Sequence, residues 1–309
     1  MMGKTQPIAV HPDVYDAEWV EEMGGMGSNN VFVQSQGQNI RPRLAYALKL
    51  GDVQPGMSVL DIGCGRGEVM LKCRSRGAAS VIGIDYATVP LQVAHDNLEA
   101  MGLHVNSDRS TVGLDRADVK ALPFADEAFD RIFMLDVVEH LYEWELQMVW
   151  REVQRLLKPD GLLIIHTLPN RWAMDYGYRM INSVIPGLPT TVADKRDIFH
   201  VNEQSVISMA RSLRWGGLQA KVWLTDQMLA QADWLRETQL KGEEAQMQIY
   251  TTLQKPLWRK LYRLATNLST RVLLVTDLFA IAWKSEGTPA TLQQTPRAYT
   301  ERLLGYLGR

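Results

Sequence analysis

Three glycines that alternate with other residues directly after an apolar run are the feature of this chain with the clearest chemistry. Residues 59–62 form this run, which also contains the acidic Asp61, and Gly63, Gly65 and Gly67 follow it. Glycine has no Cβ atom and readily adopts positive φ angles, so a ligand can lie directly against the main chain here. Glu68 stands where a G-x-G-x-x-G dinucleotide fingerprint has its third glycine, and no G-x-x-x-x-G-K-[ST] run occurs. The spacing therefore predicts a nucleotide-type loop that is neither an NAD or FAD fingerprint nor a phosphate-binding loop.

Acidic residues recur at the ends of the next apolar runs. Asp85 ends the run 80–84 at the distance expected of a βαβ unit, and a carboxylate there can accept both hydrogen bonds of a ribose diol. Asp118 lies in a turn, and its carboxylate can accept a hydrogen bond from the amino group of an adenine. Asp136 follows the run Phe129–Leu135. Because ligands of open α/β sheets bind beyond the carboxyl ends of the strands, we expect these side chains to face one crevice.

The elements that position these residues alternate between apolar runs and helical patterns, which predicts a parallel sheet with helices on both faces. We expect an α/β, Rossmann-like, doubly wound and mostly parallel seven-stranded sheet with helical lid insertions. The strands are expected at residues 59–62, 80–84, 111–114, 129–135, 162–167, 218–225 and 272–283. The helices of the core are expected at residues 41–50, 68–76, 88–101, 144–157 and 203–214.

Together these motifs resemble the class I S-adenosylmethionine-dependent methyltransferases, particularly the quinone-biosynthesis and small-molecule branch. The resemblance covers residues 53–168, with weaker similarity to residue 284. Taken alone, each acid could be a helix cap or a solvated turn residue. The resemblance depends on all the motifs occurring together in this order. It implies that S-adenosyl-L-methionine is the cofactor. It implies cofactor-binding roles for Asp61, Gly63, Cys64, Gly65, Gly67, Asp85, Tyr86, Asp118, Val119, Leu135 and Asp136.

Histidines are the candidate catalytic residues. Methyl transfer to a hydroxyl or a carbon acid requires the loss of a proton, and a histidine is the usual general base near neutrality. His140 follows the fourth strand, His166 ends the fifth, and His200 closes the loop-rich segment after it. We rank them in the order His140, His200, His166, and each also has a structural interpretation as a cap or core residue. Glu139 is interpreted as a structural acid, and no metal site is predicted.

The acceptor is expected to be a small molecule. Enzymes that methylate exocyclic amines of nucleic acids carry a [DN]-P-P-[YF] tetrad after the fourth strand. Residues 136–139 lack the prolines and the aromatic ring of that tetrad. The formal net charge of -2 offers no basic field of the kind that nucleic-acid binders carry. We therefore expect a hydroxyl, amine or activated carbon of a metabolite or lipid-like acceptor that is apolar or ring-bearing, and no nucleic-acid partner.

The chain divides into a core with additions. We expect an N-terminal cap over residues 1–40, a cofactor-binding core over 41–168, a substrate lid insertion over 169–200, a continuation of the core over 201–225, a helical insertion over 226–271, and the last core strand with a C-terminal helix over 272–309.

The insertion contains a basic amphipathic helix at residues 255–271. Leu257, Leu261 and Ala265 recur on one face, and no acidic residue occurs in this segment. The helix could lie on an anionic membrane surface, or it could be a lid or dimer helix with a solvated cationic face. A rival function is a non-catalytic subunit that keeps the cofactor fold and acts through this helix. A third, an NAD-dependent oxidoreductase, conflicts with the missing third glycine.

Composition and cysteine use are those of an ordinary globular protein. Hydrophobic residues make up 46% and charged residues 22% of the 309 residues. Cys64 and Cys73 form no C-x-x-C pair, and they fit a reducing cytosol. The N-terminal residues lack an apolar signal core, and no apolar run reaches the ~18 residues of a membrane span. We expect a cytoplasmic protein, with peripheral contact to a membrane as an open alternative. The sequence does not predict the oligomeric state.

Overall fold

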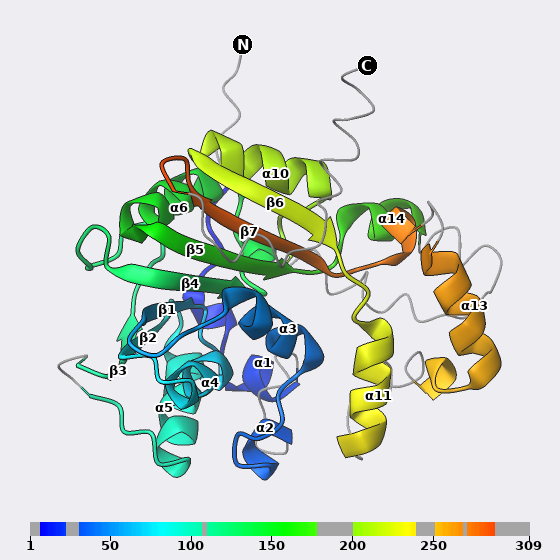
Figure 1. The fold of residues 1–309 in the computed structure, drawn as a ribbon, viewed down its shortest axis with the longest axis horizontal. Coiled ribbons are helices and arrows are strands. Elements are labelled where there is room, and N and C mark those ends of the chain that lie inside the picture. The colour runs from blue at the N-terminus through cyan, green and yellow to red at the C-terminus, as the bar shows by residue number, and fades with distance from the viewer. Residues whose placement is uncertain are drawn as a thin grey trace.

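The computed structural model of the chain describes residues 7–22, 31–106, 110–177, 200–238, 251–267 and 271–287. Seven strands form one sheet in the order β3-β2-β1-β4-β5-β7-β6 (Figure 1). Neighbouring strands from β3 to β5 are parallel, whereas β7 runs antiparallel to both β5 and β6. The predicted fold class, a mostly parallel seven-stranded sheet, is confirmed.

The strands keep close to the expected positions. β4 has the predicted bounds. β5 begins at Leu157 rather than at 162 because Leu157 already pairs with Phe129, ahead of a register shift between Phe129 and Arg131. The strands are β1 (Ser58–Ile62), β2 (Ser80–Asp85), β3 (Val112–Arg116), β4 (Phe129–Leu135), β5 (Leu157–Thr167), β6 (Leu218–Leu224) and β7 (Leu278–Lys284).

Helices cover both faces of the sheet (Figure 1). The helices α3, α4 and α5 pack on one face, and α6 and α10 pack on the other. The helices of the core are α3 (Pro42–Gly51), α4 (Glu68–Ser75), α5 (Thr88–Ala100), α6 (Glu143–Leu156) and α10 (Val206–Trp215). The remaining helical elements are η1 (Pro12–Val14), α1 (Ala17–Glu22), α2 (Val31–Gln34), η2 (Val138–His140), η3 (Ala173–Gly177), α11 (Met228–Thr238), α13 (Pro256–Asn267) and α14 (Arg271–Leu274).

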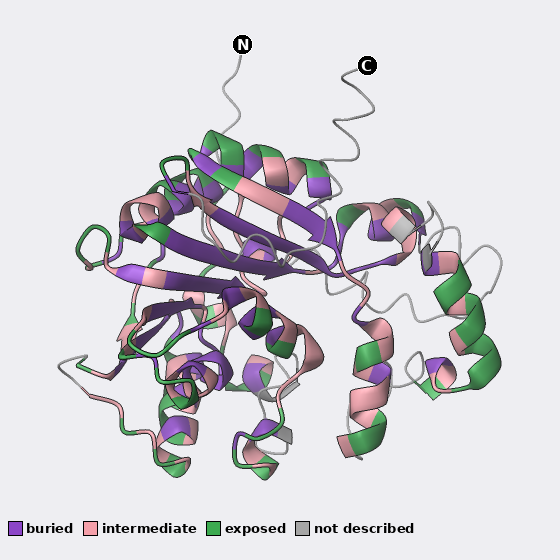
Figure 2. Ribbon diagram, viewed as in Figure 1, coloured by how far each residue is buried: buried purple, intermediate pink, exposed green. Residues whose placement is uncertain are grey.

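The core consists of two apolar layers that the sheet separates. Successive side chains of a strand point to opposite faces, so Ile132 and Met134 of β4 enter the layer under α6 and α10, whereas Phe133 enters the layer under α3 and α4. The strands are buried along most of their length (Figure 2). This two-sided burial explains why the parallel strands read as continuous apolar runs in the sequence.

A buried polar contact joins α6 to α10. The Trp150 indole Nε1 donates a hydrogen bond of 2.8 Å to Ser212 Oγ, and both side chains lie inside the core. We expect Ser212→Ala to lower the free energy of unfolding by about 1–3 kcal/mol, because the indole N–H then loses its partner away from water. Urea unfolding measures the change. Ser75→Ala, at the exposed end of α4, is the control, and equal losses in both variants would contradict the prediction.

The last strand starts later than its sequence pattern indicates. Residues 272–277 were expected to be extended, but Arg271–Leu274 form α14 and β7 begins at Leu278. The Asn170 side-chain amide donates to the main-chain carbonyls of Val272 (2.8 Å) and Val275 (3.0 Å), so a tertiary contact holds this turn.

Parts of the expected additions lie outside the described residues. These are residues 1–6 and 23–30 of the N-terminal cap, 178–199 of the lid insertion, 239–250 and 268–270 of the helical insertion, and 288–309, which include the expected C-terminal helix. Within the described ranges, no helix is both long enough and apolar enough to cross a bilayer.

Candidate active site

A pocket lies beyond the carboxyl ends of β1, β2, β3 and β4. All four strand ends contribute to its wall, as the sequence predicted, and η1, α1 and the residues around them close it from the N-terminal side. It is lined by Val10, Tyr15, Trp19, Ile62, Gly63, Gly65, Ile84, Asp85, Tyr86, Pro90, Ala117, Asp118, Val119, Lys120, Asp136, Val137, His140, Leu141 and Glu145.

The glycine loop adopts the conformation that its sequence predicts. Gly63, Gly65 and Gly67 have φ angles of 69°, 53° and 82°, in the left-handed region that side chains rarely tolerate. A Cβ atom on Gly63 would lie 2.4 Å from a methyl group of Val137. The amides of Gly63 and Cys64 both donate to the carbonyl of Ile84, at 2.8 and 3.0 Å, so the end of β2 fixes the loop. The pocket wall is therefore bare main chain at this point.

A buried acid supports the loop from behind. Asp61 is almost fully buried and does not line the pocket. Burial, with the charges of Glu68 and Asp85 nearby, raises the pKa of Asp61 well above its usual range. The Arg66 guanidinium pairs with Glu68 at 3.0 Å beside it, and both side chains are buried.

Asp85 reaches the pocket from the end of β2. Its Oδ1 accepts a hydrogen bond of 2.9 Å from the amide of Ala87, which fixes the carboxylate at the turn. Burial raises the pKa of Asp85 to about 6, although main-chain hydrogen bonds from Ala87 and others partly offset the shift. The neighbouring Tyr86 hydroxyl donates to the carbonyl of Val10, so the N-terminal segment is tied to this wall.

Asp118 shares a cation with a second acid. Lys120 Nζ lies 3.0 Å from Asp118 Oδ2 and donates at 2.7 Å to Glu145 Oε1. The Asp118 Oδ1 also accepts from the Lys120 amide at 3.0 Å, which closes a local turn. All three residues line the pocket, so a ligand here meets a carboxylate of fixed orientation.

Asp136 is held by two cations and has a positive φ angle of 60°. Arg43 on α3 places Nε and a terminal nitrogen each 2.8 Å from Asp136 Oδ2, and His166 Nδ1 contacts Oδ1. Burial alone would raise the pKa of Asp136, but the charges of Arg43 and His166 outweigh it and hold the pKa well below its usual range. The carboxylate is therefore an anion already paired on both oxygens.

His166 belongs to this ionic cluster and does not face the pocket. It is fully buried, and its Nε2 lies 3.1 Å from Asp277 Oδ1 just before β7. Burial lowers the pKa of His166, but the two carboxylates outweigh this and raise it to about 9. The expectation that all three histidines point into one crevice is corrected: both ring nitrogens of His166 are engaged by acids, and of the three only His140 lines the pocket.

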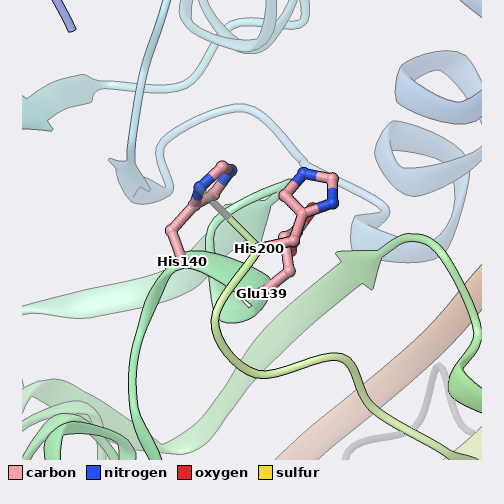
Figure 3. Close-up of side chains that lie close together, drawn as sticks. All are labelled: Glu139, His140 and His200. Atoms are coloured by element: carbon pink, nitrogen blue, oxygen red, sulfur yellow. The ribbon is translucent and has the colours of Figure 1, made fainter. Parts of the chain in front are cut away.

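His140 and His200 lie together at the pocket. Their ring centroids are 5.1 Å apart in an edge-on arrangement (Figure 3). The Tyr15 ring also lies edge-on to His140, with 5.9 Å between the centroids. His140 lines the pocket, whereas His200 does not line it and contacts the His140 ring. Glu139 is buried beside them and accepts a hydrogen bond of 2.7 Å from Thr167 Oγ1. Burial, with the charge of Asp136, raises the pKa of Glu139 to about 8.

Ligand atoms of Glu139, His140 and His200 lie within 4.8 Å of one another. Two imidazoles and one carboxylate are a donor set that binds divalent transition metals, so this cluster can hold a cation. The sequence predicted no metal ligands, since His200 is distant in the chain and no motif spacing links it to the other two residues.

Comparisons with known proteins give the family of the core. A family described as "Methyltransferase domain" matches residues 60–165. The chain is 33% identical over 151 residues to methyltransferase GfsG of Streptomyces halstedii, covering 49% of this chain and 50% of that protein. It is 33% identical over 140 residues to the ubiquinone biosynthesis O-methyltransferase of Pasteurella multocida, covering 43% and 56%. The chain thus spans about half the length of these curated relatives.

The match places a methyltransferase domain at residues 60–165. Its fold agrees with the solved phosphoethanolamine N-methyltransferase 2 of Haemonchus contortus, a complex with S-adenosylhomocysteine, at a TM-score of 0.57 and 16% identity, covering 88% of this chain and 59% of that one. The similarity at this identity concerns the fold alone. The family match speaks against the NAD-dependent oxidoreductase.

The structure divides the predicted cofactor-binding residues of the methyltransferase domain into two groups. Those that line the pocket are Gly63, Gly65, Asp85, Tyr86, Asp118, Val119 and Asp136. Those that lie behind the pocket wall, buried, are Asp61, Cys64, Gly67 and Leu135.

Sequence reasoning missed several pocket residues of the methyltransferase domain and its cap. Tyr15 and Trp19 line the pocket with their rings 4.8 Å apart, and only the general expectation of an N-terminal cap pointed to them. Lys120 and Glu145 were not singled out. Lys120 stands two residues after Asp118, so the alternation of charges in this turn was the available signal.

Proposed function

We propose that the chain transfers a methyl group from S-adenosyl-L-methionine to a hydroxyl of a small, apolar or ring-bearing acceptor. The observation that carries the proposal is the position of His140: it lies in the pocket wall, between the rings of Tyr15 and His200. A proton acceptor thus lies in an aromatic corner of the pocket that the glycine loop also lines. An amine or an activated carbon is the alternative acceptor group.

The residues present fit the donor. Gly63 and Gly65 line the pocket with bare main chain in left-handed conformations, and Asp85 offers carboxylate oxygens suited to a ribose diol. Asp118 and Val119 provide the corresponding wall for an adenine. When bound, the donor supplies an electrophilic methyl group on a sulfonium, so the protein mainly has to align the acceptor with it.

Asp136 is assigned a supporting role. Arg43 and His166 already engage both of its oxygens, so it lines the pocket as an anion whose charge is paired and shapes the end of β4. This assignment modifies the role that the family resemblance implied for it.

The acceptor side is built from aromatic residues. Tyr15, Trp19 and the two histidines form edge-on ring contacts, an arrangement that favours another ring or an apolar chain. His140 removes the proton of the acceptor hydroxyl as the oxygen attacks. A general base of this kind contributes about 10²–10⁴-fold in rate.

Replacing Asp85 by asparagine tests the donor side. We expect the dissociation constant of the donor to rise about 10- to 100-fold, because hydrogen bonds to a charged group contribute ~1.5–3 kcal/mol. Asparagine keeps the shape and can still accept from the Ala87 amide. Calorimetry with S-adenosylhomocysteine measures the affinity. Asp96→Asn on the exposed side of α5 is the matched control, and an unchanged affinity in Asp85→Asn would contradict the assignment.

Transfer itself is tested with donor carrying a labelled methyl group. The full chain is incubated with this donor and a cell extract, and the labelled products are identified by mass spectrometry. We expect label on an oxygen of an apolar or ring-bearing small molecule. Label on nitrogen or carbon would overturn the hydroxyl assignment. Tight donor binding without any transfer would instead support the non-catalytic subunit.

A further inference from the structure

Helix α13 packs against the protein through its polar side. Arg259 pairs with Asp233 of α11 at 2.7 Å, and the Tyr262 hydroxyl donates to Asp226 at 3.0 Å. Thr266, on the same side, is buried. A surface helix usually buries its apolar stripe and exposes its polar face, so α13 is oriented the opposite way.

The apolar side of α13 is consequently exposed to solvent. Leu257, Leu261 and Leu264 follow the spacing of one helical face and are 65%, 47% and 61% exposed, and Trp258 beside them is 42% exposed. We call these four residues the α13 ridge. Figure 2 shows the exposed outer side of this helix, which stands away from the sheet. A contiguous apolar ridge of this kind marks an interaction surface.

The charge next to the ridge has one sign. Lys260 and Arg263 are exposed on the helix and Lys255 is exposed at its start, and residues 255–267 contain no acid. Lysine and arginine beside an apolar face carrying leucine and tryptophan are the pattern of helices that lie in the headgroup region of a membrane. Charge complementarity therefore selects an anionic lipid surface as the occupant.

We propose that the α13 ridge docks the protein on an anionic lipid bilayer. The leucines enter the boundary between headgroups and acyl chains, Trp258 lies at headgroup level, and the lysines and arginine contact lipid phosphates. A second copy of this chain fits less well, because a twofold contact through the ridge would bring two basic helices together.

Helix α13 stands next to the edge of the sheet at which the pocket lies. Thr167 at the carboxyl end of β5 pairs with Leu278 at the start of β7, so the preceding α14 stands at that edge. Helix α13 contacts α14 (Figure 1). Docking would therefore hold the pocket edge near the bilayer, where a lipid-like acceptor resides. This last step rests on the proposed function, whereas docking itself does not.

Vesicle co-sedimentation tests the docking. The full chain is mixed with vesicles of phosphatidylcholine alone or with phosphatidylglycerol added. We expect binding to the anionic vesicles, and K260Q/R263Q to weaken it ~30-fold, since each basic residue near such a surface contributes about one kcal/mol. L261E/L264E is expected to weaken it ~100-fold or more, because two leucines lose their apolar environment. Equal binding to both vesicle types, or no binding to either, would overturn the proposal.

Controls separate docking from folding and from catalysis. Ile207→Glu and Trp215→Glu change exposed apolar residues of α10, on the other side of the fold, and are expected to bind vesicles as the wild type does. Calorimetry with S-adenosylhomocysteine on L261E/L264E checks that the donor pocket is intact. Loss of vesicle binding with full donor affinity supports the docking surface whether or not transfer is found. A dimer in lipid-free buffer that L261E/L264E dissociates would assign the ridge to a second copy and overturn the proposal.

Discussion

Replacing His140 by alanine is expected to lower kcat by about 10²–10⁴-fold while the affinity for the donor stays unchanged. The reason is its location: His140 is the histidine that lines the pocket, whereas His166 is buried with both ring nitrogens against acids. Removing it takes away the proton acceptor and leaves the glycine loop and Asp85 in place. Initial rates with the acceptor found by labelled transfer, together with calorimetry for the donor, measure both quantities.

Two comparisons sharpen this result. His104→Ala removes an exposed histidine that pairs with Glu99 at 2.8 Å far from the pocket, and it should leave kcat unchanged. His200→Ala removes a ring that contacts His140, and its effect should be smaller because His200 does not line the pocket. If His200→Ala lowered kcat more than His140→Ala, the assignment of the base would be wrong. A rate dependence on pH that persists in His140→Ala would argue against it as well.

The sequence predicts the sheet well because its signals are local. A strand buried on both faces is a short apolar run, and the residue after it marks the carboxyl edge. The sequence alone predicts that Gly63, Asp85, Asp118 and Asp136 surround one crevice, and the pocket is lined by all four. The later start of β7 was not predictable, since it depends on the side chain of Asn170, which is about a hundred residues away in the chain.

The partners of these residues were not predictable for the same reason. Nothing near Asp136 in the sequence indicates that Arg43 and His166 engage it, or that Asp277 engages His166 in turn. Periodicity has a similar limit at α13. It predicts an amphipathic helix, but the contacts of Arg259 and Tyr262 with other segments decide which face turns inward.

The buried cluster of Arg43, Asp136, His166 and Asp277 joins α3 to the ends of β4 and β5 and to the residue before β7. Two cations and two anions balance one another here, so the net charge is small although the groups are largely removed from water. Such a cluster stabilises the fold little more than a set of apolar side chains of the same volume would. Removal of one member, however, leaves a buried charge without its partner. The same contacts fix Asp136 in its left-handed conformation beside the pocket.

His166→Gln is therefore expected to lower the free energy of unfolding by about 3–5 kcal/mol at pH 6, because Asp136 and Asp277 lose the cation between them. The pH dependence should change too. The pKa of His166 is raised from 6.5 to about 9 in the folded state, so its contribution is complete below pH 6.5 and is lost as the pH rises through 9. This amounts to about 3 kcal/mol.

Urea unfolding at several pH values measures how the free energy of unfolding changes with pH. The raised pKa of Glu139, about 8, also makes stability fall as the pH rises, but most of that fall precedes pH 8 and persists in His166→Gln. The wild type should thus lose more stability than His166→Gln between pH 6.5 and 9. Glu99→Gln, which removes the exposed partner of His104, controls for surface pairs, whose contribution is small. Parallel stability curves for the wild type and His166→Gln would show that His166 is neutral in the folded protein, and the cluster would then carry a net negative charge beside the donor pocket.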